Sequence, residues 1–210
     1  MTPIAGTQTT VSTFETLVLR AEVGQSLHLS LDFSAGTPVP KGGVLEFDGT
    51  NSSADQLTLL NGTNFGDWEW FVTGTGTGEV RGHSTGLIRF QQVESLTGSE
   101  ANDVFHLSPT ASWNGSISGG AGTDRLNFGA FTTNVSVSLR DGLTTFSGTT
   151  NSISQFENVT GGTGNDLLMG DDEVNSLWGG AGNDSLYGFG GNDVLLGELG
   201  QDVLRGGAGN

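Results

Sequence analysis

Five consecutive nonapeptides fill residues 161–205, and each carries a carboxylate or amide side chain at its sixth position. They read GGTGNDLLM, GDDEVNSLW, GGAGNDSLY, GFGGNDVLL and GELGQDVLR, and their sixth residues are Asp166, Asn175, Asp184, Asp193 and Asp202. Calcium prefers oxygen ligands, and a tightly curled glycine-rich loop can turn carbonyl oxygens inward beside a carboxylate. A period of nine residues with glycines, one acid and one apolar residue is typical of a calcium-binding parallel β-roll. The pattern therefore predicts several calcium ions between stacked loops.

Each nonapeptide divides into a six-residue loop and a strand of about three residues that positions the loop. The eighth residue is leucine in all five copies, at Leu168, Leu177, Leu186, Leu195 and Leu204. Alternation along a strand points this leucine into the roll and its two neighbours outward. Two nonapeptides complete one coil, so we expect loops that lie 18 residues apart to stack on the same edge.

This stacking divides the sixth-place residues between two edges of the roll. The first edge carries Asp166, Asp184 and Asp202, which form two complete sites, because an ion between stacked loops takes a carboxylate from each. The second edge carries Asn175 and Asp193, and its one site is weakened because the amide brings an oxygen without a charge. The weakened loop also contains Asp171, Asp172 and Glu173, whose charges could compensate.

These residues resemble the RTX, or hemolysin-type, calcium-binding repeat family, whose consensus is GGxGxDxUx, over residues 161–210. The resemblance implies a right-handed calcium-binding β-roll, typically in large bacterial adhesins or toxins exported by type I secretion. In that family, carbonyls of places one and three of one loop join those of places two and four of the stacked loop. The implied carbonyl ligands are Gly161, Thr163, Gly180 and Gly182, then Gly179, Ala181, Glu198 and Gly200, and on the second edge Gly170, Asp172, Phe189 and Gly191. The departures from the consensus are Asn175, Phe189, Glu198 and Leu199.

The composition excludes several classes of partner. The chain has 210 residues with 23 acidic and 7 basic side chains, a net charge of −16, so we expect no binding to nucleic acid or anionic membranes. Cysteine is absent and hydrophobic residues make up only 34%, so bound metal should replace disulfides and one large core. No apolar stretch approaches the ~18 residues that span a bilayer. The opening MTPIAGTQTT lacks the features of a secretory signal, so we expect any export signal elsewhere.

A longer repeat occupies the middle of the chain. The similar segments are 93–98 (VESLTG) with 156–161 (FENVTG), and 49–57 with 119–126. Residues 45–110 and 115–170 therefore look like two copies of one unit of about 65 residues. Their apolar residues alternate with Gly, Thr, Ser and Asn, which suits short strands and turns.

The predicted fold is all-β, an elongated parallel β-solenoid that ends in the calcium-binding β-roll. We expect three regions. Residues 1–44 form an N-terminal β cap or a small β-module, with two strands around Leu17–Leu19 and Leu27–Leu31. Residues 45–160 form an irregular β-solenoid with the two units, and residues 161–210 form the roll.

A further metal site is a candidate in the middle region. The loops GSEAND and GGAGTD end at Asp103 and Asp124, which lie 21 residues apart, close to one full coil. One calcium ion could lie between them, with carbonyl ligands from Gly98, Glu100, Gly120 and Gly122. The alternative is that both aspartates only cap turns. For Asp55, whose loop lacks the glycines, turn capping is favoured.

No motif for catalysis is present. The three histidines are scattered, and HExxH, GxSxG and phosphate-binding loops do not occur. Trp68 and Trp70 could flank Glu69 as a sugar platform, but strand geometry puts both rings on one face and the acid on the other, which favours a packed pair. The threonines of residues 73–77 resemble one row of an ice-binding surface, although one row is not a flat array.

The sequence thus favours a non-enzymatic, calcium-binding structural region of a large secreted or cell-surface RTX-like bacterial protein, monomeric, folding on calcium outside the cell and serving in adhesion. The alternative is an accessory repeat module of a secreted polysaccharide-active enzyme, with a carbohydrate or other surface as its ligand.

Overall fold

A computed structural model describes residues 16–20, 26–33, 39, 41–49, 55–60, 67–82, 86–111 and 113–209, and these residues form an all-β structure. In chain order the strands are β1 (Thr16–Arg20), β2 (His28–Asp32), β3 (Val44–Asp48), β4 (Gln56–Leu60), β5 (Trp68–Gly74), β6 (Thr77–Gly82), β7 (Leu87–Gln91), β8 (Ser95–Thr97), β9 (Asp103–Leu107), β10 (Ser116–Ser118), β11 (Arg125–Asn127), β12 (Ser136–Ser138), β13 (Leu143–Phe146), β14 (Thr149–Ser154), β15 (Asn158–Thr160), β16 (Leu167–Met169), β17 (Ser176–Ala181), β18 (Ser185–Gly190), β19 (Val194–Leu199) and β20 (Val203–Ala208).

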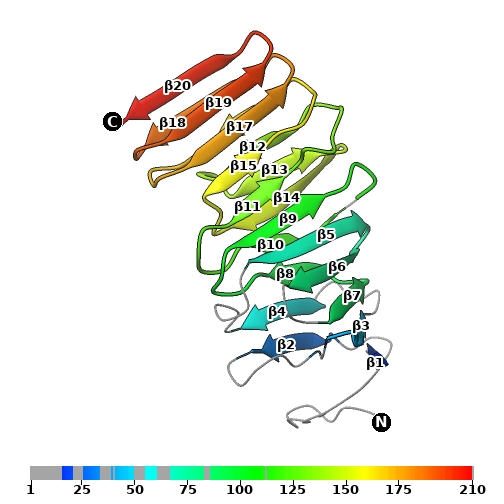
Figure 1. Cartoon of the computed structure of the whole chain (residues 1–210). Coiled ribbons are helices and arrows are strands. Elements are labelled where there is room, and N and C mark those ends of the chain that lie inside the picture. Colours follow the sequence, from blue (N-terminus) through cyan, green and yellow to red (C-terminus); the bar gives the residue numbers. More distant parts are fainter. Residues whose placement is uncertain are drawn as a thin grey trace.

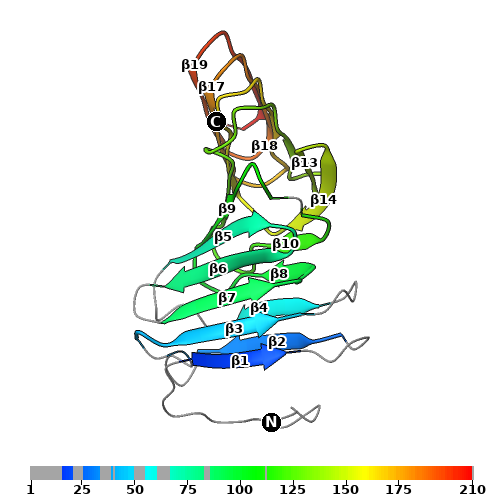
Figure 2. The same ribbon diagram turned by 90° about the vertical axis from the view of Figure 1, so that its right-hand side faces the viewer.

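The strands build two mixed ten-stranded sheets, and within each sheet they follow one another from the N-terminal to the C-terminal end of the molecule (Figures 1 and 2). Sheet A has the order β1-β3-β7-β6-β5-β9-β11-β15-β17-β19, and sheet B has the order β2-β4-β8-β10-β14-β13-β12-β16-β18-β20. Within the described strands, only β6 and β13 run antiparallel to their neighbours.

From β15 onward, successive strands alternate between the two sheets, so each pair of nonapeptides adds one strand to each sheet. The register confirms the predicted stacking at 18 residues, because Leu177 pairs with Leu195 in sheet A and Leu168 with Leu186 in sheet B. The strands therefore hold the six-residue loops in line along two edges of the molecule.

One continuous apolar core lies between the sheets and runs from Leu31 to Leu186. The eighth-place residues Leu168, Leu177 and Leu186 are completely buried, as predicted, whereas Leu204 is 45% exposed. Leu204 pairs in register with Leu186 and so lies on the same face of sheet B; it is exposed because β20 is the last strand of the sheet and no further coil packs on it among the described residues.

The two predicted units of the middle region share one hydrogen-bonding pattern. In the first, the amide of Asp55 donates to Oε2 of Glu94 (3.0 Å), and the amide of Glu94 donates back to the carbonyl of Asp55. In the second, the amide of Asp124 donates to Oε2 of Glu157 (2.7 Å), and the amide of Glu157 donates back to the carbonyl of Asp124. Each glutamate thus fixes a tight corner to the aspartate of a neighbouring strand.

The antiparallel runs of the two units lie in opposite sheets. The first leaves β4 of sheet B, adds the antiparallel run β5-β6-β7 to sheet A and returns to β8 of sheet B. The second leaves β11 of sheet A, adds β12-β13-β14 to sheet B and returns to β15 of sheet A. In both corners the residue that precedes the buried apolar side chain has a positive φ, 54° at Gln92 and 56° at Gln155.

The N-terminal region supplies the outermost strand of each sheet, β1 and β2, and Leu31 joins the shared core. Much of the segment predicted over residues 1–44, including the opening ten residues, lies outside the described residues, so its assignment as cap or module stays a prediction. The described residues contain no helix that could cross a membrane.

Two sequence alternatives are resolved by the packing of β5. Trp68 and Trp70 are both completely buried while Glu69 is exposed, which confirms the packed pair. The threonines of residues 73–77 do not lie along one strand, because Thr75 and Gly76 form the turn between β5 and β6, with φ of 60° at Gly76.

Candidate metal centres

A ladder of carboxylates links the stacked loops of the first edge. The amide of Asp166 donates to Oδ1 of Asp184 (2.8 Å), and the amide of Asp184 donates to Oδ1 of Asp202 (2.9 Å). Each sixth-place carboxylate therefore lies between its own loop and the loop before it. One oxygen of each carboxylate holds the coils together, which leaves the other free for a second partner.

Two further hydrogen bonds fix the spacing between the first two loops of this edge. The amide of Ala181 donates to the carbonyl of Gly162 (2.9 Å). At the fifth place, the amide of Asn183 donates to Oδ1 of Asn165 (2.7 Å). The next loop repeats the fifth-place bond through the amide of Gln201, which donates to Asn183 (2.8 Å).

The first glycine of each loop borders a space lined by two oxygens. A Cβ atom at Gly161 would collide with Oδ2 of Asp166 and with the carbonyl oxygen of Gly179. A Cβ atom at Gly179 would likewise collide with Oδ2 of Asp184, and would lie 2.9 Å from the carbonyl oxygen of Gly197. Glycine thus keeps open a cradle in which a carboxylate and the carbonyl of the following loop converge.

The loops of the first edge adopt two conformations. In loop 161–166, the amide of Gly162 donates to Oδ2 of Asp166 (2.7 Å). In loop 179–184, Gly180 and Gly182 have φ of 100° and 127°, and the buried Oδ2 of Asp184 has no hydrogen-bond partner. The left-handed backbone turns the amide of Gly180 away from the carboxylate of Asp184. Oδ2 of Asp184 therefore faces the cradle without a hydrogen bond.

The second edge repeats this arrangement with an amide in place of one carboxylate. The amide of Asn175 donates to Oδ1 of Asp193 (3.0 Å), while Oδ1 of Asn175 accepts a hydrogen bond from the amide of Asp171 (2.8 Å). Oδ2 of Asp193 is buried without a partner. In this loop pair, Phe189 has φ of 72° and Gly191 has φ of 95°.

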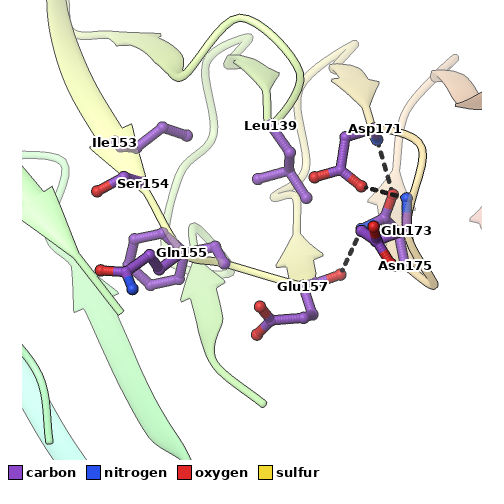
Figure 3. Close-up of a pocket in the computed structure, with 9 residues that line it drawn as sticks. Leu139, Ile153, Ser154, Gln155, Glu157, Asp171, Glu173 and Asn175 are labelled. Atoms are coloured by element: carbon purple, nitrogen blue, oxygen red, sulfur yellow. Dashed lines mark hydrogen bonds between the residues drawn. The ribbon is translucent and has the colours of Figure 1, made fainter. Parts of the chain in front are cut away.

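A cavity of 90 Å³ lies where the loop that ends at Asn175 meets the corner at Glu157 (Figure 3). The carboxylates of Asp171 and Glu173 lie on one side of it, and Oδ1 of Asp171 accepts a hydrogen bond from the amide of Glu173 (2.9 Å). Asn175 Nδ2 donates to the carbonyl of Glu157 (3.3 Å). The exposed Asp172 side chain instead lies 3.8 Å from Arg140.

The first loop of the roll stacks on a segment without an acid. Oδ1 of Asp166 accepts a hydrogen bond from the amide of Val135 (2.9 Å), and the amide of Thr163 donates to the carbonyl of Phe131 (2.8 Å). Both Phe131 and Val135 are buried, and Phe131 packs against Phe128 and Phe146. The ladder of the first edge thus begins on an apolar cluster.

The middle loops lie together as the sequence predicts. β9 pairs in parallel with β11 at an offset of 21 residues, and the amide of Asp103 donates to Oδ1 of Asp124 (2.7 Å). Both aspartates are completely buried. Gly120 and Gly122 have φ of 105° and 131°.

The last loops of the roll are more open to solvent. Glu198 has a positive φ of 69° and Gly200 one of 143°, and a Cβ atom at Gly200 would collide with the carbonyl oxygen of Gly182. Glu198 is exposed, and Leu199 is 73% exposed. Asp202 nevertheless keeps its place in the ladder, because its Oδ1 accepts the hydrogen bond from the amide of Asp184.

Burial raises the pKa values of four of the loop carboxylates, those of Asp103, Asp124, Asp166 and Asp184. Burial raises the pKa of Asp103 to about 6, against the lowering effect of hydrogen bonds from Trp70 and Ser99. It raises the pKa of Asp124 to about 7, and the neighbouring carboxylates add to this increase. The pKa values of Asp166 and Asp184 are also raised, mainly by burial.

These loops fit a hard divalent cation. Between Thr16 and Gly209, no group of three or more His, Cys, Asp or Glu side chains converges in the described ranges, so the donor set would be one carboxylate per loop with backbone carbonyls. Such all-oxygen sets suit calcium. The unpartnered oxygens of Asp184 and Asp193 and the glycine cradles supply the charge and the space.

Several participating residues were not anticipated from the sequence. The fifth-place ladder of Asn165 and Asn183 could have been found, because an Asn-Asp pair recurs in three nonapeptides. No local sequence pattern indicates that Trp70 binds Asp103 or that Glu157 binds Asp124, because each partner lies 33 residues away.

The comparisons with known proteins support the same assignment. The family model for the RTX calcium-binding nonapeptide repeat matches four copies, in residues 116–132, 160–195 and 187–210. A search of curated proteins found no match. The resemblance inferred from the nonapeptides over residues 161–210 is confirmed, and the match at residues 116–132 was not anticipated; the chain carries RTX calcium-binding nonapeptide repeats.

Proposed function

We propose that this chain is a calcium-folded structural region of a large secreted or cell-surface RTX-type bacterial protein. The observation that carries the proposal is a pair of buried carboxylate oxygens, Oδ2 of Asp184 and Oδ2 of Asp193, that have no hydrogen-bond partner. An unpaired buried charge is costly. Bound calcium would neutralise these carboxylates.

In this proposal both edges of the roll bind cations. Asp166, Asp184 and Asp202 hold cations on the first edge together with loop carbonyls, and Asp193 does so on the second edge with Asn175. Residues 161–210 then form a right-handed parallel β-roll that ends an elongated β-solenoid. The region has a structural and not an enzymatic role, and we assign adhesion to the larger protein of which it is a part.

Calcium binding would act as a folding switch, because the ligands converge only in the folded chain. With a Kd of ~100 μM, extracellular millimolar calcium would add roughly 1.4 kcal/mol per site. In the cytoplasm, where calcium is scarce, self-repulsion of a chain with net charge −16 keeps the repeats loose and exportable.

A calcium titration followed by far-UV circular dichroism tests the proposal, with magnesium as the control ion. We expect a cooperative gain of β signal with calcium alone, and a midpoint that rises several-fold in Asp184→Asn. The matched control is Glu69→Gln, which removes one exposed acid from β5, away from the metal loops, and should leave the midpoint unchanged. A chain whose β signal is complete in chelator and indifferent to calcium contradicts the proposal.

A further inference from the structure

The outer face of sheet A carries a row of planar and polar side chains, one from each of five neighbouring strands. The row runs in register across β5, β9, β11, β15 and β17, through Phe71, His106, Asn127, Thr160 and Trp178. All five residues are half-buried, and the spacing between strands makes the row roughly 19 Å long. We propose that this row, together with Arg125 beside it, binds a carboxylated sugar.

Arg125 supplies a positive charge that no acid of the described residues neutralises. Its guanidinium carbon lies 4.4 Å from the centre of the Trp178 ring, and its Nε is buried without a hydrogen-bond partner. The chain has 23 acidic side chains, and four other arginines form ion pairs with carboxylates, namely Arg20, Arg81, Arg89 and Arg140. Arg125 forms no ion pair with a described residue, so its charge is available to an external anion.

The hydrogen bonds around Asn127 determine which nitrogen of His106 carries the proton. Oδ1 of Asn127 accepts a hydrogen bond from the amide of Gly129 (2.8 Å), so its Nδ2 faces Nδ1 of His106 (3.1 Å). An amide nitrogen only donates, so Nδ1 is the acceptor and the neutral ring carries its proton on Nε2. Burial lowers the pKa of His106, against the raising effect of Glu69, which favours this neutral ring at pH 7.

Nε2 of His106 is therefore a second donor that lacks an acceptor. It is buried without a hydrogen-bond partner, and Oε1 of Glu69 lies 3.8 Å away, too far for a hydrogen bond. Arg125 lies on the adjacent strand, where it pairs with Val104, two residues before His106. An unsatisfied buried donor costs free energy, and one ligand with several oxygens could satisfy both donors.

The chemistry of the face favours a carboxylate carried by a sugar. A carboxylate accepts strong, charge-assisted hydrogen bonds from a guanidinium group. The amide of Asn127 and the hydroxyl of Thr160 lie in the same row and suit the neutral hydroxyl groups of a sugar. Phe71, which is stacked on His106 (4.7 Å between ring centres), and Trp178 lie at the two ends of the row, where their rings can pack on the apolar face of a sugar ring.

An acidic peptide fits this face less well. The net charge of −16 repels a run of acidic residues. Each strand of the row is paired on both sides within sheet A, so a peptide cannot add to the sheet as a further strand. A sugar with one carboxylate among several neutral hydroxyl groups avoids both obstacles.

Calorimetric titration of the whole chain at a fixed, saturating concentration of calcium tests the inference. The ligands are two matched pairs, sialyllactose against lactose and trigalacturonate against its methyl ester, which represent a glycoconjugate and a polysaccharide. In at least one pair we expect the acidic sugar to bind about tenfold more tightly than its neutral counterpart. Tryptophan emission should change as well, because Trp178 is half-buried while the other three tryptophans are completely buried.

Three variants locate the binding. Arg125→Gln should reduce the affinity for the acidic sugar to that of the neutral one. The matched control is Arg89→Gln, which removes an exposed arginine from β7 of the same sheet and should leave the affinity unchanged. His106→Phe keeps a ring against Phe71 but removes the Nε2 donor, so it should weaken binding several-fold even where Arg125→Gln fails to fold. Circular dichroism in calcium verifies the fold of each variant.

The inference names a ligand for the adhesion assigned above and rests on the proposed function in that respect only. Equal binding of acidic and neutral sugars, or an unchanged affinity in folded Arg125→Gln, overturns it. Tighter binding of hexaglutamate than of both acidic sugars also overturns it and assigns the face to an acidic peptide. If the chain folds in chelator but binds an acidic sugar through Arg125, the proposed function fails and this inference stands. A chain that folds on calcium and binds no sugar gives the reverse result.

Discussion

Asp166 and Asp184 lie 18 residues apart in the sequence, and in the structure the backbone amide of Asp166 donates a 2.8 Å hydrogen bond to Oδ1 of Asp184. The second oxygen of Asp184 is buried and has no partner. The two oxygens thus have different tasks, since one joins successive coils and the other faces the cation cradle. An Asp→Asn change can keep the first task while it removes the charge needed for the second.

Asn175 is the position where the chain already carries such an amide, and restoring the acid should strengthen calcium binding. We expect Asn175→Asp to lower the calcium midpoint of the second edge, because it pairs a second charge with Asp193. The same change also removes the Nδ2 that donates to the carbonyl of Glu157, so the thermal stability of the calcium-bound chain should rise by less than the gain in calcium affinity alone would give. Calorimetric titration and thermal unfolding measure both effects, with the exposed Asn192→Asp as the control. An unchanged midpoint would show that the second edge does not bind calcium.

Gly179→Ala should disturb a cradle that Gly206→Ala leaves intact. A Cβ atom at Gly179 would collide with Oδ2 of Asp184, whereas one at Gly206 would contact nothing within 4 Å. We expect a loss of about 1–3 kcal/mol for the first variant, as for other overpacked sites, and a weaker calcium response. Thermal unfolding in calcium compares the two. Equal stability of both variants would argue against a tightly lined cradle.

Glu198→Gly should stabilise the calcium-bound roll. Glu198 has a φ of 69°, a left-handed conformation that costs a non-glycine residue roughly 1–2 kcal/mol. Glycine at this position relieves that strain but costs about 0.5–1 kcal/mol, because it makes the unfolded chain more flexible. We therefore expect the free energy of unfolding to rise by about 0.5–1 kcal/mol. Glu173→Gly removes the same charge from a residue that is not left-handed, and it should give no gain. A matching rise in Tm for both variants would assign the effect to charge alone.

The metal-free chain should become more stable as the pH falls from 8 to 5. Burial raises the pKa of Asp103 to about 6 and the pKa of Asp124 to about 7, both above the 3.8 of an unperturbed aspartate. A raised pKa in the folded state means that this stability is present at low pH and is lost as the pH rises through 6 and 7. Chemical unfolding in chelator, followed by tryptophan emission, measures it.

In saturating calcium the chain should instead become less stable as the pH falls, because protons then compete with the ion for the same oxygens. In chelator, the variant Asp124→Asn should weaken the dependence of the unfolding free energy on pH near pH 7. A metal-free chain that loses stability steadily below pH 7 would contradict the raised pKa of these two groups.

The nonapeptides determined much of the roll by themselves. A period of nine with leucine at the eighth place fixes which side chains face inward, and it fixes the 18-residue register that pairs Leu168 with Leu186. This works because every contact repeats at constant spacing along the chain. The longer repeat was also visible, since its corners preserve a glutamate next to an apolar residue, at Glu94 and Glu157.

Only the tertiary structure decided how the units and loops are used. An alternating strand pattern does not show to which sheet a strand belongs, so only the structure shows that the antiparallel run lies in sheet A for the first unit and in sheet B for the second. Whether a loop closes on its own aspartate or leaves an oxygen unpaired depends on its backbone conformation, since Gly180 is left-handed and Gly162 is not, although the two loops have similar sequences. The contact of Trp70 with Asp103 joins residues 33 apart through packing, which no local pattern records.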